Sequence, residues 1–327
     1  MPPTPSGAPI SLVGGVVAHN EEASVATAIR SLTDQELGDA AVWSEIWVVA
    51  SGCTDRTVER VRAIAASDPR VRLIVQPTRQ GKGLALNEVL DRADGDAVVL
   101  LNGDAEAEPN AVRSLLRTAA DLTPPFAVMG RPIPRSRAGD RALDGVLSLL
   151  WAIHDEVHRS TIDDGSGNHL SDELLLLSLP VASRFTAETV NDGAELGAAL
   201  VRSHGSLRYA TEARVRVETP TTALGYLRQR RRIYAGHAQV TRAAGVVPTT
   251  MVSLLIREPR RGRRILARAI QADPHRGSLP ALVALESLSL ALAVWDRLPP
   301  RRDHARWRRL PGARAPRRSS VGGSPRT

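Results

Sequence analysis

The sequence contains very little cysteine, lysine or aromatic residue. Its 327 residues include one cysteine, Cys53, so no internal disulfide can form and we expect a reducing compartment such as the cytoplasm. Aromatic residues make up 3% of the chain, which leaves few side chains on which bases could stack, and we predict no nucleic-acid partner. Because 42 of the 43 basic residues are arginine, the position of the single lysine, Lys82, is informative.

Long apolar runs are also absent. No stretch of 18 or more uninterrupted apolar residues occurs, and the first residues lack the basic start and apolar run of a secretion signal. We therefore expect neither a membrane-spanning helix nor a cleaved leader. The hydrophobic content of 43% and charged content of 24% are typical of a folded globular protein.

The net charge of +8 is unevenly distributed along the chain. Residues 1–227 carry 21 basic and 30 acidic side chains, for −9, whereas residues 228–268 carry eleven arginines against one glutamate, for +10. Residues 299–327 carry nine arginines against one aspartate, for +8. Such basic segments are either solvated, disordered charge runs or surfaces that face the phosphates of a ligand or an anionic membrane.

Short apolar runs alternate with amphipathic segments over the first 130 residues. The pattern predicts a buried parallel sheet with right-handed helical crossovers, in which ligands bind at the carboxyl ends of the strands. Polar clusters follow three of these strands, at residues 19–22, 51–55 and 102–104. The expected strands are 10–17, 46–50, 71–75 and 97–101, and the expected helices are 22–32, 54–66, 84–93 and 111–119.

The pattern after residue 130 is weaker, and the Pro- and Arg-rich end of the chain is expected to be unstructured. The expected helices there are 144–157, 192–203, 222–242, 248–268 and 279–298, and the expected strands are 174–178, 207–210 and 215–217.

Six segments, in order, resemble the motifs of glycosyltransferase family 2. Each is weak alone, but six in sequence across residues 10–240 are specific. They are VAHNEE at 17–22, VVASGCTDRT at 48–57, QGKGLALN at 80–87, LNGDAEAEP at 101–109, VNDGAEL at 190–196 and QRRRIYAGH at 229–237.

The resemblance implies an α/β fold of the GT-A type, with a mostly parallel sheet flanked by helices and a helical C-terminal extension. It implies a catalytic domain over residues 1–245, and the sequence pattern beyond it predicts a helical extension over 246–298 and a basic tail over 299–327. The implied reaction is inverting transfer of a sugar from a UDP-, GDP- or dTDP-sugar to a saccharide, lipid-linked or small-molecule acceptor. Two other functions stay open: a nucleotidyltransferase on a related sheet, and a non-catalytic nucleic-acid-binding protein.

The loop after the fourth strand carries the expected metal ligand, Asp104. Sugar transfer builds negative charge on the departing diphosphate, which Mg²⁺ or Mn²⁺ balances, and these ions prefer carboxylate oxygens and substrate phosphates. The alternative for Asp104 is an acidic residue ahead of a helix. The family usually has aspartate where this chain has Asn102, whose amide adds no charge.

The first four motifs are expected to bind the donor nucleotide. Lys82 stands between glycines at a helix start, where anions bind, unless it is a solvated surface lysine. Glu21 is available to the nucleoside or supplies charge to the first helix, and Ser51 stands where the family often has an acid. The full predicted set is Ala18, His19, Glu21, Ser51, Lys82, Asn102 and Gly103.

Asp192 is the predicted general base, because inversion requires a carboxylate within hydrogen-bond reach of the acceptor hydroxyl. The alternative is that Asp192 caps the helix that follows it. On the next helix we expect Arg231, Arg232 and His237 to bind the diphosphate, since arginine makes paired contacts with phosphate oxygens. Otherwise these side chains form a solvated basic face.

Three further sequence patterns are not assigned to the active site. Residues 163–166 copy a family string but follow no strand, so we expect a loop. His154 and His158 have the spacing of a zinc-protease pair, but Asp155 stands where the glutamate is required, so surface histidines are expected. The apolar residues 279–298 and the basic tail either rest on an anionic membrane surface or pack on the catalytic domain.

Overall fold

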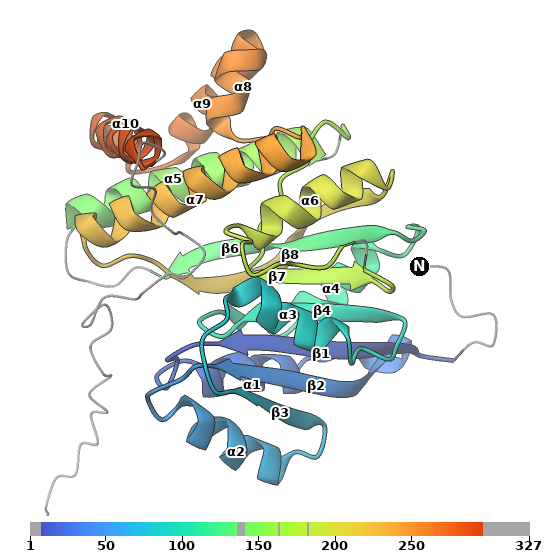
Figure 1. Ribbon diagram of the computed structural model, residues 1–327. Helices are drawn as coiled ribbons and strands as arrows, with labels where there is room; N and C mark the ends of the chain where they lie inside the picture. Colours follow the sequence, from blue (N-terminus) through green and yellow to red (C-terminus); the bar gives the residue numbers. More distant parts are fainter. Residues whose placement is uncertain (1–7, 136–140, 163, 182, 297–327) are drawn as a thin grey trace, which may run out of the picture.

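The computed structural model describes residues 8–135, 141–162, 164–181 and 183–296. One eight-stranded sheet crosses the molecule, with helices on both of its faces (Figure 1). The strands are β1 (Ile10–Ala18), β2 (Ala41–Ser51), β3 (Val71–Gln76), β4 (Ala97–Asn102), β5 (Glu106–Ala107), β6 (Phe126–Arg135), β7 (Leu174–Ser178) and β8 (Ser206–Glu218). The helices are α1 (Val25–Thr33), α2 (Thr57–Ser67), α3 (Lys82–Leu90), α4 (Ala111–Thr118), α5 (Arg141–Ile162), α6 (Asp192–Arg202), α7 (Ala223–Ala244), α8 (Met251–Arg257), α9 (Pro259–Ala272) and α10 (Leu279–Trp295), with single 3₁₀ turns at Gly38–Ala40 and Arg276–Ser278.

The strands lie in the order β3-β2-β1-β4-β7-β6-β8-β5. The first four pair in parallel, as the sequence pattern predicts. Strand β7 pairs antiparallel with both β4 and β6, and its first residue, Leu174, lies opposite Leu101 near the end of β4. The amino end of β7 therefore lies at the same edge of the sheet as the carboxyl ends of β1, β2 and β4.

Apolar side chains cover both faces of this sheet, which is why the central strands read as continuous hydrophobic runs. On one face the core includes Ile29 of α1, Val61 of α2 and Leu115 of α4. On the other face it includes Val89 of α3 and Leu196 of α6. Two layers of helices thus enclose the sheet, and the fold is the α/β arrangement that was predicted.

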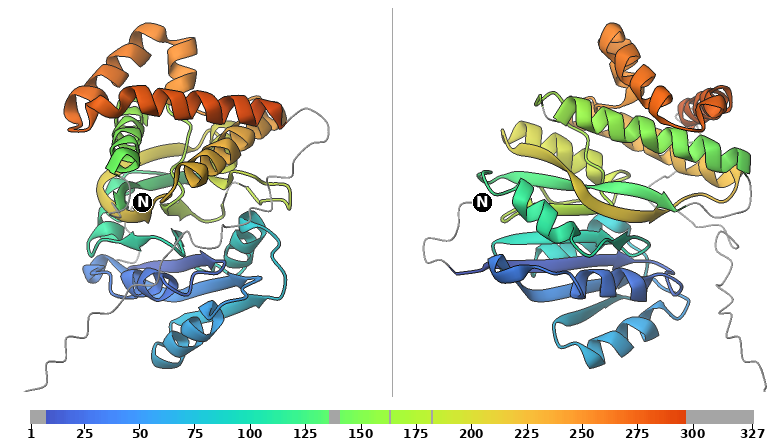
Figure 2. Two further views of the ribbon diagram at one scale, coloured as in Figure 1. Left: turned by 90° about the vertical axis from the view of Figure 1, so that its left-hand side faces the viewer. Right: turned by 180° about the vertical axis from the view of Figure 1, so that it is seen from behind.

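The C-terminal helices stack on the two long helices α5 and α7, outside the sheet layers (Figure 2). A third core joins them through Leu149 of α5, Tyr226 of α7, Ile265 of α9 and Leu282 of α10. The predicted extension at residues 246–298 therefore shares its core with helices of the preceding segment. The predicted tail at 299–327 lies outside the described residues.

The structure corrects three details of the sequence pattern. Strand β6 was not predicted, and its two prolines, Pro132 and Pro134, conceal it because proline is normally confined to strand edges and irregularities. The two short strands expected at 207–210 and 215–217 form one strand, β8, whose pairing with β6 shifts register after Gly130. The helix expected at 248–268 is two helices, α8 and α9, that meet at Glu258 before Pro259.

Candidate active site

A cleft of about 810 Å³ opens at the edge of the sheet where β1, β2 and β4 end. All three polar clusters that follow these strands contribute to its walls, together with the starts of α3 and α6 and one face of α7. The predicted site residues that line the cleft are His19, Glu21, Ser51, Lys82, Asn102, Gly103, Asp104, Asp192 and Arg232.

Hydrogen bonds between the loops after β1 and β2 fix one end of the cleft. The His19 Nδ1–H donates to the carbonyl oxygen of Ser51 at 2.7 Å. Asn20, with a left-handed φ of 55°, accepts from the Thr54 backbone N–H at 2.8 Å. The Ser51 hydroxyl is buried and has no hydrogen-bond partner among the described residues, so it is available to a ligand.

Two acidic residues in this region also stabilise helix starts. The Asp55 carboxylate accepts from the backbone N–H groups of Thr57 at 3.0 Å and Glu22 at 3.1 Å. Burial alone would raise the pKa of Asp55, but these hydrogen bonds lower it below its ordinary value. Glu21 is 2% exposed and accepts from the Ser24 hydroxyl at 2.8 Å, so it supports the first turn of α1 while it lines the cleft.

The loop after β4 places Asp104 in the cleft. A side chain at Gly103 would put its Cβ 2.8 Å from the Val17 carbonyl oxygen, so only glycine lets this loop pass the end of β1. Strand β5 separates Asp104 from α4, which begins at Ala111. Asp104 is therefore not in the first turn of that helix, and the alternative of a helix-start residue has no support in the fold.

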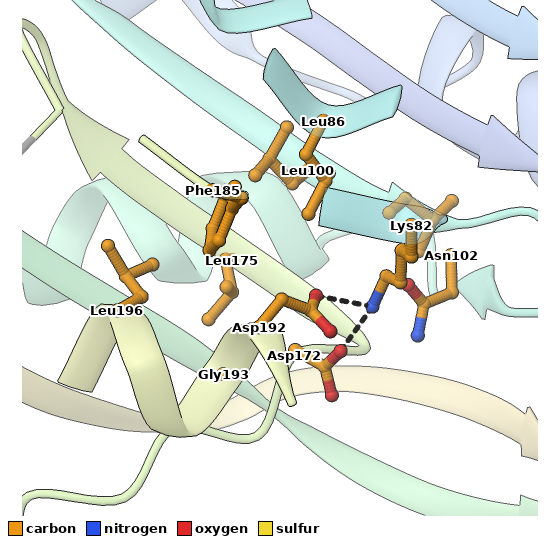
Figure 3. A pocket seen from close by; sticks show the side chains of 11 residues that line it. Lys82, Leu86, Leu100, Asn102, Asp172, Leu175, Phe185, Asp192, Gly193 and Leu196 are labelled. Carbon is orange, nitrogen blue, oxygen red and sulfur yellow. Dashed lines mark hydrogen bonds and ion pairs between the residues drawn. The ribbon is translucent and has the colours of Figure 1, made fainter. Parts of the chain in front are cut away.

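Lys82 lies between two aspartates at the centre of the site (Figure 3). It is the first residue of α3, after Gly81 with φ 105°. Its Nζ forms an ion pair with Asp192 at 2.7 Å and another with Asp172. Burial alone would lower the pKa of Lys82, but the two carboxylates raise it well above its ordinary value. The predicted phosphate ligand is thus already paired with carboxylates.

Asp192 begins α6 without capping it. The cap is Asn191, whose side-chain oxygen accepts from the Ala194 backbone N–H at 2.9 Å. The Asp192 side chain is therefore free of the capping role and points to Lys82 in the cleft wall. Burial, and then the charge of Asp172, raise its pKa to about 6.

Asp172 and Glu173 were not predicted as site residues, and both line the cleft. They lie just before β7, so an antiparallel strand delivers them to the edge where the parallel strands end. Burial would raise the pKa of Asp172, but Lys82 holds it well below the ordinary range. Burial and the charge of Asp172 raise the pKa of Glu173 to about 7. The sequence did contain a signal for these site residues, because an acidic pair stands directly ahead of the apolar residues 174–177.

Helix α7 divides its arginines between two faces. Arg228 and Arg232 line the cleft, whereas Arg230 and Arg231 pair with Glu286 and Asp296, at and just after α10. The predicted diphosphate ligand Arg232 is thus at the site and Arg231 is not. Two further predicted residues also lie outside the cleft lining: Ala18, which is 1% exposed within β1, and His237.

His237 belongs instead to a histidine cluster with His154, His158 and His169, in which His158 is fully buried and the other three are half-buried. The His154 and His158 Nε2 atoms are 3.0 Å apart, and the rings of His169 and His237 have centroids 4.8 Å apart. The expectation of surface histidines at 154 and 158 was wrong, because α5 turns this face towards β8, where His158 lies beside Tyr209. Within the described ranges, no group of three or more His, Cys, Asp or Glu side chains has an arrangement that could hold a metal ion.

The predicted loop around residue 164 is present, and Asp163 lies outside the described residues. The Asp164 carboxylate accepts from the Ser166 hydroxyl at 2.6 Å and pairs with Arg261 of α9 at 2.5 Å. These contacts tie the loop to α9, away from the cleft.

Residues 15–167 match the sequence profile of a family described as glycosyl transferase family 2. Over 108 residues the chain is 30% identical to EpsH of Bacillus subtilis, which is named as a glycosyltransferase, and over 111 residues it is 30% identical to the beta-monoglucosyldiacylglycerol synthase of Synechocystis. Each match covers 33% of this chain, and the matched segments span 30% and 22% of those two relatives.

Two solved structures share the fold over most of its length. The mannosyltransferase PcManGT of Pyrobaculum calidifontis, in complex with GDP-Man and Mn²⁺, has 18% sequence identity and a TM-score of 0.61 over 91% of this chain and 89% of that one. Residues 1–349 of S. aureus TarS, in complex with UDP-GlcNAc, have 11% identity and a TM-score of 0.50 over 89% and 93%. The likeness shows that the fold is of the GT-A type.

Proposed function

Residues 15–167 belong to glycosyltransferase family 2, and we propose that the chain is an inverting glycosyltransferase that moves a sugar from a nucleoside diphosphate to an acceptor hydroxyl. The observation that carries the proposal is Asp192, a buried carboxylate with a raised pKa, held by Lys82 in the wall of the cleft that also contains Asp104. A general base and a phosphate-facing carboxylate in one cleft are what this reaction requires.

The donor is proposed to lie along the ends of β1, β2 and β4. His19, Glu21 and Ser51 line the end of the cleft assigned to the nucleoside, and the Ser51 hydroxyl is available to a base edge. The fold neighbours are named with GDP-Man and UDP-GlcNAc, so a nucleoside diphosphate sugar is the donor class we expect.

The residues at the end of β4 fit a divalent cation that is shared with the substrate. Asp104 offers a carboxylate and Asn102 an amide oxygen, and both are hard ligands that suit Mg²⁺ or Mn²⁺. Since the described part of the chain has no cluster of three metal ligands, the diphosphate oxygens would complete the coordination. When bound, the cation would supply positive charge to the leaving diphosphate.

The face of α7 that lines the cleft is proposed to bind the diphosphate. Arg232 was predicted for this role, and Arg228 one turn earlier lines the same cleft. Guanidinium groups match phosphate oxygens with paired hydrogen bonds. Arg231 and His237 are left out of this assignment, because neither lines the cleft.

In the proposed step the Asp192 carboxylate accepts the proton of the acceptor hydroxyl. The hydroxyl oxygen forms a bond to the anomeric carbon as the bond from that carbon to the diphosphate oxygen breaks, and the electron pair leaves with the diphosphate. Attack from the opposite side inverts the anomeric configuration. Lys82 acts as a positioning residue that keeps Asp192 oriented and ionised.

Two matched substitutions test the assignment of the base. Asp192→Asn preserves size but cannot accept the proton, so we expect transfer to fall by about 10²–10⁴-fold while nucleotide binding, measured by calorimetry with Mn²⁺, is retained. Asp172→Asn removes the other carboxylate that pairs with Lys82 and should reduce transfer far less. The reverse ranking would assign the base to Asp172, and full transfer in both variants would overturn the proposed mechanism.

The acceptor is proposed to be a saccharide, a lipid-linked molecule or a small molecule with a free hydroxyl. The cytoplasm is the proposed location, because the chain has a single cysteine and needs no oxidising compartment. An NMR assignment of the anomeric configuration in the product tests inversion directly.

A further inference from the structure

Helix α10 turns its one charged residue and Ser289 towards the protein, while most of its large apolar residues face the outside. Between residues 279 and 295 it has one charged side chain, Glu286. Ser289 is fully buried, and Asp296, just after the helix, is 6% exposed. A helix on the surface of a globular protein normally has the opposite arrangement, with its charges in water.

A buried polar network with α7 fixes this orientation. The Glu286 carboxylate accepts from the hydroxyls of Tyr226 and Tyr234, each at 2.6 Å, and from Arg230 at 2.6 Å. Asp296 forms a paired ion contact with Arg231. Because breaking such buried pairs is costly, α10 cannot easily rotate to hide its apolar side.

The outer face of α10 is consequently broad, apolar and free of charge. Val283 is 55% exposed, Leu288 47%, Val294 51% and Trp295 70%. The segment Arg276–Trp295 is long and apolar enough to cross a membrane by length and composition, in contrast to the expectation from the sequence, and only 17% of its most apolar window is buried. Since α10 crosses over α7 and α5 and contacts both, it lies flat on the domain and does not project from it (Figure 2).

The sequence on both sides of α10 is strongly basic. Within residues 246–296, all of them described, Glu258 is the one exposed acidic residue. The sequence continues beyond α10 with residues 299–327, which carry nine arginines and one aspartate. The exposed arginines of α8, α9 and the turn that follows are Arg257, Arg260, Arg263, Arg264, Arg268 and Arg276.

We propose that the outer face of α10 docks in the plane of an anionic lipid bilayer, with the arginines of α8 and α9 contacting the headgroups. An uncharged apolar helix inserts at the boundary between headgroups and acyl chains, and Trp295 is suited to that boundary. Each arginine near an anionic leaflet adds attraction. A second copy of the chain fits this surface less well, because two such faces would bring like charges together.

Flotation of the full chain with liposomes tests the proposal. We expect binding to vesicles of phosphatidylcholine with one-third phosphatidylglycerol, and little binding to phosphatidylcholine alone. The double variant Leu288→Glu/Val294→Glu places charges on the outer face and should weaken binding at least about tenfold. The matched control is Val201→Glu, which adds a charge at a residue of α6 that is 45% exposed, and it should bind as the unmodified protein does.

The arginines are tested separately by Arg263→Glu/Arg264→Glu, which should weaken binding most at low salt. Thermal melting of each variant checks that the fold is retained. Equal flotation of the Leu288→Glu/Val294→Glu variant and the Val201→Glu control would overturn the proposal. So would a dimer in analytical ultracentrifugation that the double variant dissociates, together with no vesicle binding, since a second copy would then be the occupant.

Discussion

Three ionisable side chains share one buried corner of the cleft, and their order of proton affinity determines which of them can act as a base. Lys82 keeps Asp172 ionised, while burial and the charge of Asp172 make Asp192 the more basic carboxylate. Two carboxylates whose environments separate their pKa values in this way commonly take different roles. In the proposed reaction the residue with the higher pKa, Asp192, is the one that accepts the proton, and Asp172 raises that pKa.

The first consequence is a pH profile. Asp192 must be ionised to accept a proton, so kcat should rise with pH through about 6 and then level off. Lys82→Met removes the charge that favours the ionised form, and the rising limb should move to higher pH. Arg92→Met removes a cation that pairs with Glu88 outside the cleft and serves as the control. If the rising part of the kcat–pH profile is unchanged in Lys82→Met, Lys82 does not act through Asp192.

Metal dependence is predicted at Asp104. Asp104→Ala should abolish transfer and the part of nucleotide binding that Mn²⁺ enhances, because the nearby Asn102 contributes no charge. The measurement is the shift in Tm on adding nucleotide with and without Mn²⁺, since a ligand of the folded state raises Tm. Asp121→Ala, at an exposed residue outside the cleft lining, should behave as the unmodified chain. Full transfer in excess EDTA would contradict the metal assignment.

At the scale of single elements, α7 has arginines that line the cleft and arginines that hold α10 and Asp296, and its sequence alone does not distinguish the two groups. Consecutive residues are offset by about 100° around a helix, which is enough to point Arg232 into the cleft and Arg231 towards Asp296. Which arginine faces a ligand depends on the phase of the helix, and that phase is set by packing against α10. Motif spacing alone therefore could not select between them.

Arg231 and Arg232 should accordingly respond differently to the same substitution. Arg232→Ala should weaken donor binding about tenfold or more, because a charge-assisted phosphate contact is lost. Arg231→Ala should retain donor binding but lower the free energy of unfolding by about 3 kcal/mol, since it removes one side of a buried ion pair. Calorimetric titration and urea unfolding of both variants measure the two effects. If Arg231→Ala loses donor affinity and Arg232→Ala does not, Arg231 is the residue that binds the donor.

The elements predicted from the sequence were those whose evidence is local. Strands β1 to β4 and the helices between them follow from apolar periodicity, and most of the residues that the motifs singled out line one cleft. Asp172 was missed because its place depends on the antiparallel insertion of β7 beside β4, a non-local pairing. The capping role of Asn191, which frees Asp192, likewise depends on backbone geometry at the start of α6.

At the scale of the whole molecule, the histidine cluster makes stability depend on pH. Burial lowers the pKa of His154 to about 3 and of His169 to about 4, and it lowers those of His158 and His237 well below 6.5. In the unfolded chain these four groups titrate near 6.5, so the unfolded state binds more protons as the pH falls below that value. Stability is full above about pH 6.5 and is lost towards pH 4.

Two carboxyls act in the opposite direction. Glu173 and Asp192 have pKa values of about 7 and 6, so the folded state holds protons there that the unfolded state releases. Between pH 6 and 5 the unfolded state binds about four protons on the histidines, and the folded state binds about two on the carboxyls. The unfolded state therefore holds about two more protons, and the free energy of unfolding should fall by about 2.7 kcal/mol per pH unit. Urea unfolding at these pH values measures the slope.

A substitution isolates the contribution of the cluster. His158→Phe keeps a buried ring but removes one titrating group, so the slope should become shallower by about 1.4 kcal/mol per pH unit. The control is His204→Asn, at an exposed residue whose φ of 54° asparagine tolerates. Equal slopes in His158→Phe and the control would show that the cluster is not the source of acid sensitivity.

The contact between α7 and α10 bears on where the chain can be divided. A chain cut after residue 278 would lose an apolar helix, yet it would expose Tyr226, now fully buried, and leave Arg230 and Arg231 without their acceptors. Those side chains alternate along α7 with the arginines that line the cleft. The smallest self-sufficient unit of this protein therefore extends to Asp296, and shortening it to improve its behaviour in solution would loosen the wall of its own cleft.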